Sequence, residues 1–458
     1  MTRHRYLALL AIALGTLVVP LDSSVNIAFP YITRAFGIEI AAIQWVVISY
    51  VLTHFSLMLL FGKLGDLIGH KLIFQAGLGV SAVAFVLCAS ATAFGWLLAA
   101  RVSQGLGAAL VVSCGPALIT SYFQESQRGK ALGFYTAIFG IGAVLGPTLG
   151  GVMVSAWGWA SVFWFRAPVC LLALMLIWYV PAQSKPTSSG SFDLLGAILL
   201  VLMLSGLFLT LNQSQNSNMP PLGILAMGAV AALLFVAFAF HESRAVTPIV
   251  RIGIFRDVNF SLQSLANIVI NIVGFSIMLL VPFFLANATE YSTMTSGLIL
   301  ATAPLGMACA GPLAGWALAH VPGNRLALLA AIFMIAGLSM IARWDRQTGI
   351  VFMTFAALLQ GIGMGVFQVA YSHIVTGVLP RSERGIAGSL AMVTRSGGVV
   401  TGATVLSWMF ANAFAASGEF VDAFQTTFRH AALLCAGFFL LTLLRPRIWF
   451  GNRVGHRK

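Results

Sequence analysis

The sequence predicts an all-α integral membrane protein with fourteen transmembrane helices. Only 8% of its 458 residues are charged and 59% are hydrophobic, whereas about a quarter of the residues in a soluble domain are charged. Apolar runs of about 20 residues, the length that crosses a bilayer core, recur along the whole chain. The basic residues gather in alternate gaps between these runs, which is typical of cytoplasmic loops.

The fourteen apolar runs follow one another with short polar gaps between them. The first run begins after basic residues, as a signal peptide does, but it is too long and contains Pro20 and Asp22. We therefore expect a retained first helix. The expected spans are 6–29, 42–61, 72–92, 96–118, 132–156, 161–180, 194–213, 222–240, 261–285, 296–318, 326–342, 350–376, 387–413 and 428–444.

Two gaps, at about 181–193 and 241–260, are longer than the others, and the two spans between them carry few distinctive polar residues. Segments 62–66 (GKLGD) and 311–315 (GPLAG) form a weak internal repeat, because a glycine and a basic residue follow each of them. Such repeats indicate two related halves. The expected parts are an N-terminal six-helix bundle (1–180), an inserted helix pair with flanking cytoplasmic loops (181–260) and a C-terminal six-helix bundle (261–458).

An even number of spans places both termini on the same side of the membrane. Of the 25 lysines and arginines, 18 lie in the gaps on the side of the N-terminus, four lie in the opposite gaps and three lie inside spans. Cytoplasmic loops carry the excess of basic residues. Both termini are therefore expected in the cytoplasm, and the chain in a cell membrane of the bacterial inner-membrane type.

The composition excludes several classes of protein. The net charge of +13 comes from few basic residues spread between apolar runs, so neither a nucleic-acid-binding domain nor a soluble enzyme is expected. There is no phosphate-binding loop of the G-x-x-x-x-G-K-[ST] type, which argues against pumping driven by ATP. The five cysteines lie within apolar runs without metal-ligand spacing. We expect no enzymatic activity and no metal site.

Four charged residues lie clearly inside spans: Asp22, Arg101, Arg166 and Arg395. A charge at mid-membrane costs about 2.5–3.5 kcal/mol on insertion scales, so such residues are functional by default. Asp22 is the one carboxylate well inside a span, and burial favours its protonated form. It could load and release a proton if water reached it from each side in turn. The alternative is that Asp22 caps a break near Pro20 or pairs with Arg101 as part of the structure.

Five segments carry a family resemblance. They are 21–30 (LDSSVNIAFP), 44–52 (QWVVISYVL), 101–109 (RVSQGLGAA), 142–151 (GAVLGPTLGG) and 395–398 (RSGG). With these segments in this order, the sequence resembles the fourteen-span drug:proton antiporters of the major facilitator superfamily. Ser24 stands where that family usually has threonine.

The resemblance implies proton-coupled efflux of small amphipathic organic compounds, including antibiotics, by alternating access of two six-helix bundles. The implied partners are a small-molecule substrate, protons and the lipid bilayer. A monomer is expected, with no nucleic acid and no cofactor other than the proton gradient.

Proton coupling would depend on Asp22, Arg101 and His54. Arg101 has no carboxylate in its own helix and needs Asp22, backbone carbonyls or water, although a permanent structural ion pair is the alternative. His54 is either a proton relay or a neutral, hydrogen-bonded packing residue.

The fifth span carries a stripe of small residues, Gly142, Gly146 and Gly150, which lets helices approach closely. Pro147 adds a site for a kink. We interpret this stripe as mechanical rather than substrate-binding.

The gap 62–71 (GKLGDLIGHK) resembles the superfamily's cytoplasmic signature G-x-x-x-D-R-x-G-R-K, with Leu67 and His70 where arginine is common. It would latch one state through Asp66 and the basic residues, or it is an ordinary turn. The expected conformational residues are Gly62, Gly65, Asp66, Gly69, Lys71, Gly142, Gly146, Pro147, Gly150 and Arg395.

Arg166 is the most discordant residue, because the related family usually has asparagine at this position. It lies about six residues inside its span, so we expect its side chain to reach the outer membrane interface. The alternative is that it meets an anionic substrate group or a gating carboxylate.

Polar and aromatic side chains expected to face a cavity are the candidates for substrate contact. Asn267 and Asn271 are four residues apart, and Gln360 and Gln368 are eight apart, so each pair shares a helix face. Aromatic walls suit lipophilic ligands, but tryptophan and tyrosine are also enriched at membrane interfaces. The full set is Asn26, Trp45, Tyr50, Arg166, Asn267, Asn271, Gln360, Gln368 and Tyr371.

Two other functions remain open. The same fold could export one specific, anionic metabolite, because the expected spans contain three arginines and one carboxylate. A membrane enzyme or sensor is the remote alternative, since it would need a converging nucleophile or metal set that the spans do not show.

Overall fold

The computed structural model describes residues 2–122, 125–180, 193–213, 220–245, 252–378 and 384–450. Within these ranges every regular element is a helix. Thirteen membrane spans in this part of the chain are long and apolar enough to cross a bilayer, and α9 (Leu194–Gln213) adds a helix with a shorter apolar stretch, Leu194–Leu207. The predicted all-α membrane fold is confirmed.

The chain forms two compact units. Unit 1 comprises Met1–Phe238 and Glu290–Ala301, and unit 2 comprises Ala239–Thr289 and Thr302–Lys458. The predicted division of the chain at residues 180 and 260 stays a prediction.

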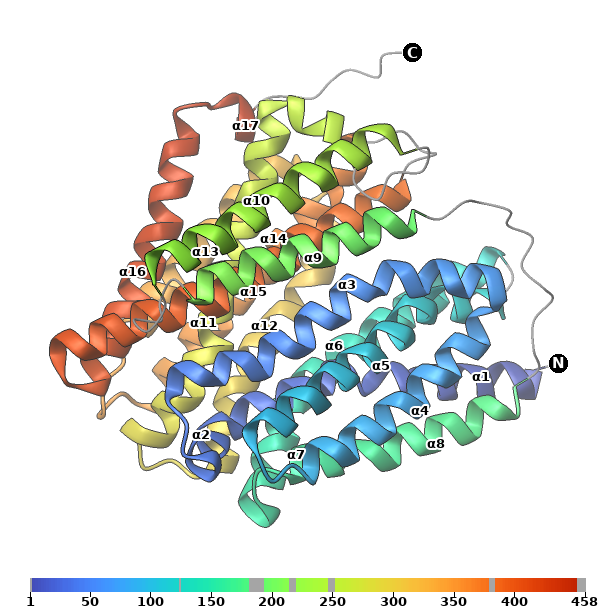
Figure 1. Cartoon of the computed structure of the whole chain (residues 1–458), viewed down its shortest axis with the longest axis horizontal. Helices are drawn as coiled ribbons and strands as arrows, with labels where there is room; N and C mark the ends of the chain where they lie inside the picture. The colour runs from blue at the N-terminus through green and yellow to red at the C-terminus, as the bar shows by residue number, and fades with distance from the viewer. Residues whose placement is uncertain are drawn as a thin grey trace. The chain divides into compact units, whose positions relative to one another are not determined.

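Unit 1 holds the helices from α1 to α9, most of α10 and the first part of α12. Figure 1 labels these helices. The elements that precede α9 are α1 (Thr2–Leu17), the 3-10 helix η1 (Pro20–Ser23), α2 (Ser24–Phe36), the 3-10 helix η2 (Ile40–Ile43), α3 (Gln44–Ile68), α4 (His70–Ala89), α5 (Phe94–Ser121), α6 (Glu125–Trp157), α7 (Ser161–Trp164) and α8 (Arg166–Trp178). α10 spans Pro221–Arg244.

Glycines let α5 pack closely between α3 and α4. A Cβ on Gly105 would lie 2.6 Å from the carbonyl oxygen of Tyr50 in α3, and one on Gly107 would lie 2.8 Å from the amide nitrogen of Ser81 in α4. A larger residue at either position would push the helices apart. Around this centre, α8 packs on α1 and α4, and α6 packs on η1 and α2.

Unit 2 holds the later helices. They are the 3-10 helix η3 (Ile252–Arg256), α11 (Val258–Ala288), the rest of α12 (Thr293–Ala317), α13 (Gly323–Ile341), α14 (Ile350–Val378), α15 (Arg384–Ser417), α16 (Phe420–Leu443) and α17 (Arg447–Phe450). α13 packs on α14, α11 packs on α15, and α16 packs on both α13 and α15.

Several predicted spans differ from the observed helices at their ends: α3 continues to Ile68 rather than to residue 61, and α16 begins at Phe420 rather than at residue 428. Two spans also differ in form. The first span is interrupted at η1 and continues to Phe36, so it is longer than predicted and is not one continuous helix. The sixth span begins with the single turn of α7 before α8. The helices of the predicted inserted pair are α9, which packs on α3, and α10, whose large apolar side chains such as Leu222 (77% exposed) suit contact with lipid; their insertion stays a prediction.

Candidate functional site

The first transmembrane span is broken near its centre by η1, which carries Asp22. Pro20 has no backbone N–H and interrupts the helical hydrogen-bond ladder. The hydroxyl of Ser23 donates to the carbonyl of Pro20 at 2.8 Å, within the same turn. Irregular backbone of this kind is tolerated in a membrane protein where the protein buries it. The break predicted near Pro20 is therefore present.

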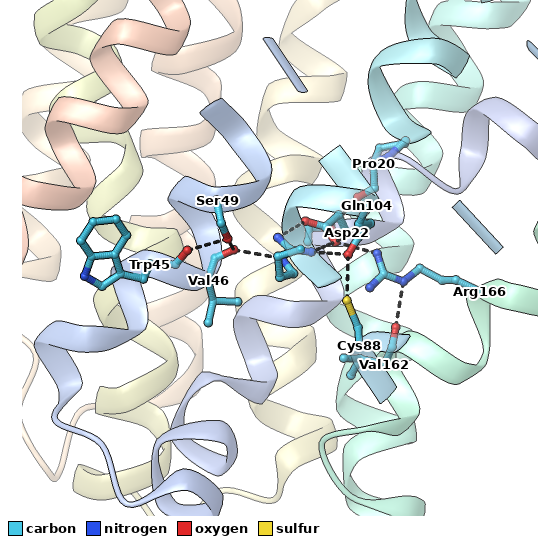
Figure 2. A network of polar contacts seen from close by, with 11 residues as sticks. Pro20, Asp22, Trp45, Val46, Ser49, Cys88, Gln104, Val162 and Arg166 are labelled. Carbon is cyan, nitrogen blue, oxygen red and sulfur yellow. Dashed lines mark hydrogen bonds and ion pairs between the residues drawn. The ribbon is translucent and has the colours of Figure 1, made fainter. Parts of the chain in front are cut away.

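Three side chains from two other helices converge on the carboxylate of Asp22. Figure 2 labels two of them, Gln104 and Arg166. Its Oδ1 accepts hydrogen bonds from Arg101 Nη1, Gln104 Nε2 and Arg166 Nη1, each at 2.7 Å. Its Oδ2 accepts from Arg101 Nη2 at 2.9 Å. Arg101 thus binds both oxygens, the geometry of the strongest carboxylate pairs. The predicted contact between Asp22 and Arg101 is present.

Arg101 is held by acceptors besides Asp22. Its Nε donates to the carbonyl of Val46 in α3 at 2.9 Å, and its Nη1 also donates to Gln104 Oε1 at 2.7 Å. The guanidinium carbon lies 4.4 Å from the centre of the Tyr50 ring, within the range of a cation–π contact. The side chain is 2% exposed, so these contacts account for its burial.

Arg166 is fully buried and reaches Asp22 from the start of α8. Its Nε donates to the carbonyl of Val162 at 2.8 Å, and its guanidinium carbon lies 4.4 Å from the ring centre of Phe85 and 5.3 Å from that of Phe163. The prediction that Arg166 extends to the membrane interface is wrong, because its side chain turns inward to a carboxylate. The alternative, a contact with an acidic side chain, is what the structure shows.

The cluster of Asp22, Arg101, Arg166 and Gln104 holds two positive charges and one negative charge. Removing one member of a buried ion pair costs about 3–5 kcal/mol, because the other charge is left uncompensated. Protonation of Asp22 removes its charge in the same way. A proton bound at this site would therefore break two ion pairs at once.

Sequence reasoning missed Gln104, although it lies three residues after Arg101 in the same segment. Residues three apart share a helix face, so this spacing could have placed both side chains at one site. The amide of Gln104 links the ion pair, because its Nε2 donates to Asp22 while its Oε1 accepts from Arg101.

Replacing Gln104 by leucine is expected to lower the free energy of unfolding by about 1–3 kcal/mol, since buried polar atoms of the cluster lose a hydrogen-bond partner. Gln347→Leu is the matched control: this glutamine is exposed in a turn, and its replacement should change stability by less than about 0.5 kcal/mol. Thermal unfolding of both purified variants measures the difference. Equal melting temperatures for Gln104→Leu and the wild type would refute the linking role of the amide.

Tyr50 and His54 lie beside the cluster on α3. The His54 ring lies 5.6 Å from the ring centre of Tyr50 and stacks on Phe55 at 4.8 Å. Both Tyr50 and His54 are buried. The structure thus places His54 one helical turn from the residue that covers Arg101, while its role in proton coupling stays a prediction.

Two further substrate candidates in unit 1 are half-buried, Asn26 in α2 and Trp45 in α3. Asn26 follows Asp22 by one helical turn. Their partial exposure leaves part of each side chain open to a ligand, and their role in binding stays a prediction.

The glycine stripe of α6 packs directly on the break of the first span. A Cβ on Gly142 would lie 2.6 Å from Cγ of Pro20, and one on Gly146 would enter the space of the Ser23 hydroxyl. Gly150 comes similarly close to the first turn of α2. The stripe therefore allows a close approach, as predicted, and the segment it approaches is the one that carries the carboxylate.

The glycines of the gap between α3 and α4 shape the turn. Gly69 has a φ of +109°, a backbone conformation that other residues rarely adopt. A Cβ on Gly65 would lie 2.5 Å from Nδ1 of His70, so the chain approaches itself closely there. Gly62 is half-buried. The side chain of Asp66 lies outside the described residues.

Lys71, the basic residue at the end of this gap, contacts the sixth span. Its Nζ donates to the carbonyl of Val180 and, at 3.5 Å, to that of Trp178. A cation at the carbonyl end of a helix is stabilising. Lys71 therefore fixes the C-terminal end of α8 to the first turn of α4, while its role as a latch stays a prediction.

In unit 2, four of the substrate candidates form one hydrogen-bonded cluster. Asn271 Nδ2 donates to Asn267 Oδ1 at 3.1 Å, and Gln368 Nε2 donates to the Oδ1 atoms of both asparagines at 3.3 and 3.4 Å. Asn267 Nδ2 donates to Thr394 Oγ1 at 2.9 Å, and the Tyr371 hydroxyl lies 3.4 Å from the same oxygen. Both asparagines and Tyr371 are buried, whereas Gln368 is partly exposed. Of these four, Gln368 is the side chain that a ligand can reach without rearrangement.

The segment 104–107 (QGLG) of α5 returns as 360–363 (QGIG) in α14. A Cβ on Gly361 would clash with the backbone carbonyl of Ala303 in α12, just as a Cβ on Gly105 would clash with a backbone carbonyl of α3. A Cβ on the second glycine of each segment would lie against a backbone nitrogen. This nitrogen belongs to α13 in unit 2 and to α4 in unit 1. The two segments therefore pack in the same way within their own units.

The repeat shows what unit 2 lacks at the matching position. Three residues before the repeated glutamine, it has Ala357 where unit 1 has Arg101. The glutamine itself, Gln360, donates to the backbone carbonyl of Gly274 at 3.5 Å, whereas its counterpart donates to Asp22. The arginine of the ion pair is thus replaced by alanine in unit 2, and the repeated glutamine donates to a backbone carbonyl instead of a carboxylate.

The remaining conformational candidates are Pro147 and Arg395. Pro147 lies within α6 without ending it. Arg395 is half-buried in α15, three residues before Gly398, whose Cβ would lie 2.6 Å from Cβ of Asn271. Their roles stay predictions.

Comparisons with known proteins place the chain in a family. The family model of the Major Facilitator Superfamily matches residues 12–255 and 264–457. The riboflavin transporter RibZ of Clostridioides difficile is 27% identical over 421 residues, which cover 91% of each chain. The multidrug resistance protein Stp of Mycobacterium tuberculosis is 28% identical over 414 residues, 90% of this chain and 77% of that protein.

A solved structure shows the same fold. The D-xylose-proton symporter superimposes with a TM-score of 0.69 at 15% identity and covers 97% of both chains. At this identity the likeness concerns the fold alone. Because the family model matches almost the whole chain, the protein belongs to the Major Facilitator Superfamily of membrane transporters.

Proposed function

We propose that this transporter is a proton-coupled exporter of small amphipathic organic compounds, an antiporter that works by alternating access. The observation that carries the proposal is the carboxylate of Asp22, which two buried arginines hold at the break of the first span. The name of one relative, Stp, refers to multidrug resistance, which supports export, whereas that of RibZ refers to riboflavin transport.

In the proposed cycle Asp22 alternates between its charged and protonated forms. The charged form holds α5 and α8 against the break through Arg101 and Arg166. The protonated form loses both ion pairs, and the break then changes its contact with the glycine stripe of α6. The Asp22 side chain is 13% exposed, so the protein does not enclose it completely.

Tyr50 and His54 supply the route toward the cytoplasm in this proposal. With both termini in the cytoplasm, α3 runs inward from Gln44, so His54 lies on the cytoplasmic side of Tyr50. An imidazole is the side chain best suited to pass protons near neutral pH. The protein is proposed to act as a monomer in a bacterial inner membrane, with the proton gradient as its energy source and neither cofactor nor nucleic acid.

The proposed substrate contacts remain those predicted from the sequence. In unit 1 they are Asn26, Trp45 and Tyr50, and in unit 2 they are Asn267, Asn271, Gln360, Gln368 and Tyr371. In this function Arg166 binds Asp22 and is not proposed as a direct substrate contact.

A second candidate function is the export of one anionic metabolite. The excess of one positive charge at the Asp22 cluster favours it. The two functions differ in how acid affects binding. Acidification should weaken the binding of a compound that needs the charged carboxylate, and it should strengthen the binding of an anion that takes the place of this carboxylate on the arginines.

Transport into inverted vesicles tests the proposal with three probes: ethidium, a permanent cation; chloramphenicol, which is uncharged; and para-aminohippurate, an anion. A vesicle interior made acidic should drive uptake of ethidium or chloramphenicol, and a protonophore should abolish this uptake. Vesicles without the protein control for passive partition. Uptake of para-aminohippurate alone would favour the metabolite exporter. Uptake that is unchanged by the protonophore would refute proton coupling.

A further inference from the structure

Protonation of Asp22 would leave its two arginines with different numbers of remaining hydrogen-bond acceptors. Arg101 keeps the carbonyl of Val46 at 2.9 Å and a glutamine oxygen of its own helix at 2.7 Å. Among the residues that the structure describes, Arg166 keeps only the carbonyl of Val162 at 2.8 Å, which lies one turn before it in the same span. The two arginines therefore depend on Asp22 to different degrees, and Arg166 depends on it more.

The surroundings of Arg166 offer little compensation for a lost counter-charge. Its side chain is 0% exposed, and its Nη2 is a buried donor without a hydrogen-bond partner among the described residues. The rings of Phe85 and Phe163 cover the guanidinium. Aromatic faces attract a cation, but they offset only part of the loss of a carboxylate. A buried, uncompensated guanidinium is unstable, so the residue must move when Asp22 is neutral.

Arg166 cannot move far without the helix that carries it. Its Nε is bonded to the carbonyl of Val162 in α7, so the guanidinium is fixed to the junction of α7 and α8. The opposite end of α8 is held by Lys71, which donates to the carbonyls of Trp178 and Val180. One end of α8 is thus attached through an ion pair that depends on a proton, and the other through a contact that does not involve Asp22.

We propose that Arg166 is the positioning residue that turns protonation of Asp22 into a displacement of the N-terminal end of α8, with the end at Lys71 as the pivot. This inference rests on the proposed proton site at Asp22. The other charged and titratable groups around that carboxylate, among the described residues, are Arg101 on α5, Tyr50 on α3 and Cys88 on α4.

The displacement can be measured with two spin labels. Trp164 precedes α8 and is 49% exposed, and Val102 on α5 is 45% exposed, so both accept a label after replacement by cysteine. Cys309, the exposed native thiol, is first replaced by serine. In the purified full chain, the distance distribution between the labels should differ between acidic and alkaline pH. The Asp22→Asn variant should show the acidic distribution at both pH values.

Variants of Arg166 decide the proposal. Arg166→Gln should lose the pH-dependent shift in distance, and Arg166→Lys, which keeps the charge, should retain part of it. Arg343→Gln is the matched control, because this arginine is exposed in a turn. In this variant the distance between the labels should change with pH as it does in the wild type. A full shift in Arg166→Gln, or a shift that persists in Asp22→Asn, would overturn the inference. If Arg166→Gln does not fold, absence of a shift in Arg166→Lys together with wild-type binding would overturn it as well.

Transport separates this inference from the proposed function. Arg166→Gln should lose proton-driven uptake of ethidium while it still binds ethidium at equilibrium, because Arg166 acts on movement rather than on binding. If Asp22→Asn transports uphill as the wild type does, the proposed function fails. If Asp22→Asn loses uphill transport but Arg166→Gln keeps it, only the inference about Arg166 fails.

Discussion

Replacing Asp22 by asparagine is expected to abolish proton-driven accumulation of substrate. Asparagine has nearly the same shape as aspartate but cannot bind a proton, and it removes the negative charge between Arg101 and Arg166. Uptake in the presence of a pH gradient should therefore fall to the level seen with a protonophore. Exchange of labelled for unlabelled substrate without a gradient should persist, because it does not need the proton.

The same variant should also be less stable, because the two arginines lose their counter-charge. Breaking a buried ion pair in this way costs about 3–5 kcal/mol, so transport must be expressed per amount of folded protein. Asp345→Asn is the control. The hydroxyl of Thr348 and the backbone N–H of Gln347 hold the pKa of Asp345 below its usual value, but this carboxylate is exposed in a turn. Wild-type accumulation by Asp22→Asn would disprove the assigned proton site.

Replacing Gly146 by leucine is expected to eliminate transport, because the side chain would occupy the space of the Ser23 hydroxyl at the break of the first span. Overpacking of a well-packed contact costs about 1–3 kcal/mol and occasionally more. Here the contact is with the segment that carries Asp22, so the ion-pair cluster should be displaced as well. Transport in vesicles and the yield of folded protein measure the two effects.

Gly79→Leu is the matched control, since it lies on α4 in the same unit with open space around the position of a Cβ. It should leave transport unchanged. A milder pair tests the geometry itself: Gly146→Ala should impair transport, and the addition of Ser23→Ala should restore part of it by removing the clashing oxygen. Full activity of Gly146→Leu would show that α6 does not need this close approach.

Much of the fold could be predicted because the bilayer imposes a simple rule on sequence. A span needs a continuous apolar stretch, and such stretches are visible without any knowledge of tertiary structure. The contact between Asp22 and Arg101 was also accessible, because one buried carboxylate and a nearby buried arginine need each other. The internal match between 104–107 and 360–363 is also present in the sequence, but it lies within spans, whereas the predicted repeat was based on the segments 62–66 and 311–315.

The position of Arg166 could not be predicted, because it depends on how α8 is rotated about its own axis. About six residues inside a span, a long side chain can extend to the interface or turn inward, and the sequence does not distinguish the two. The partner of the glycine stripe was hidden for a similar reason. A stripe of small residues indicates that some helix comes close, but it does not say which one.

The buried Ala357, which stands in unit 2 where unit 1 has Arg101, has a consequence for the evolutionary history of such a chain. An arginine introduced alone at Ala357 would be left without a carboxylate in the interior, so that single step weakens the fold until a second substitution supplies the counter-charge. A buried pair of an arginine and a carboxylate is therefore gained or lost only through an intermediate sequence that is less stable.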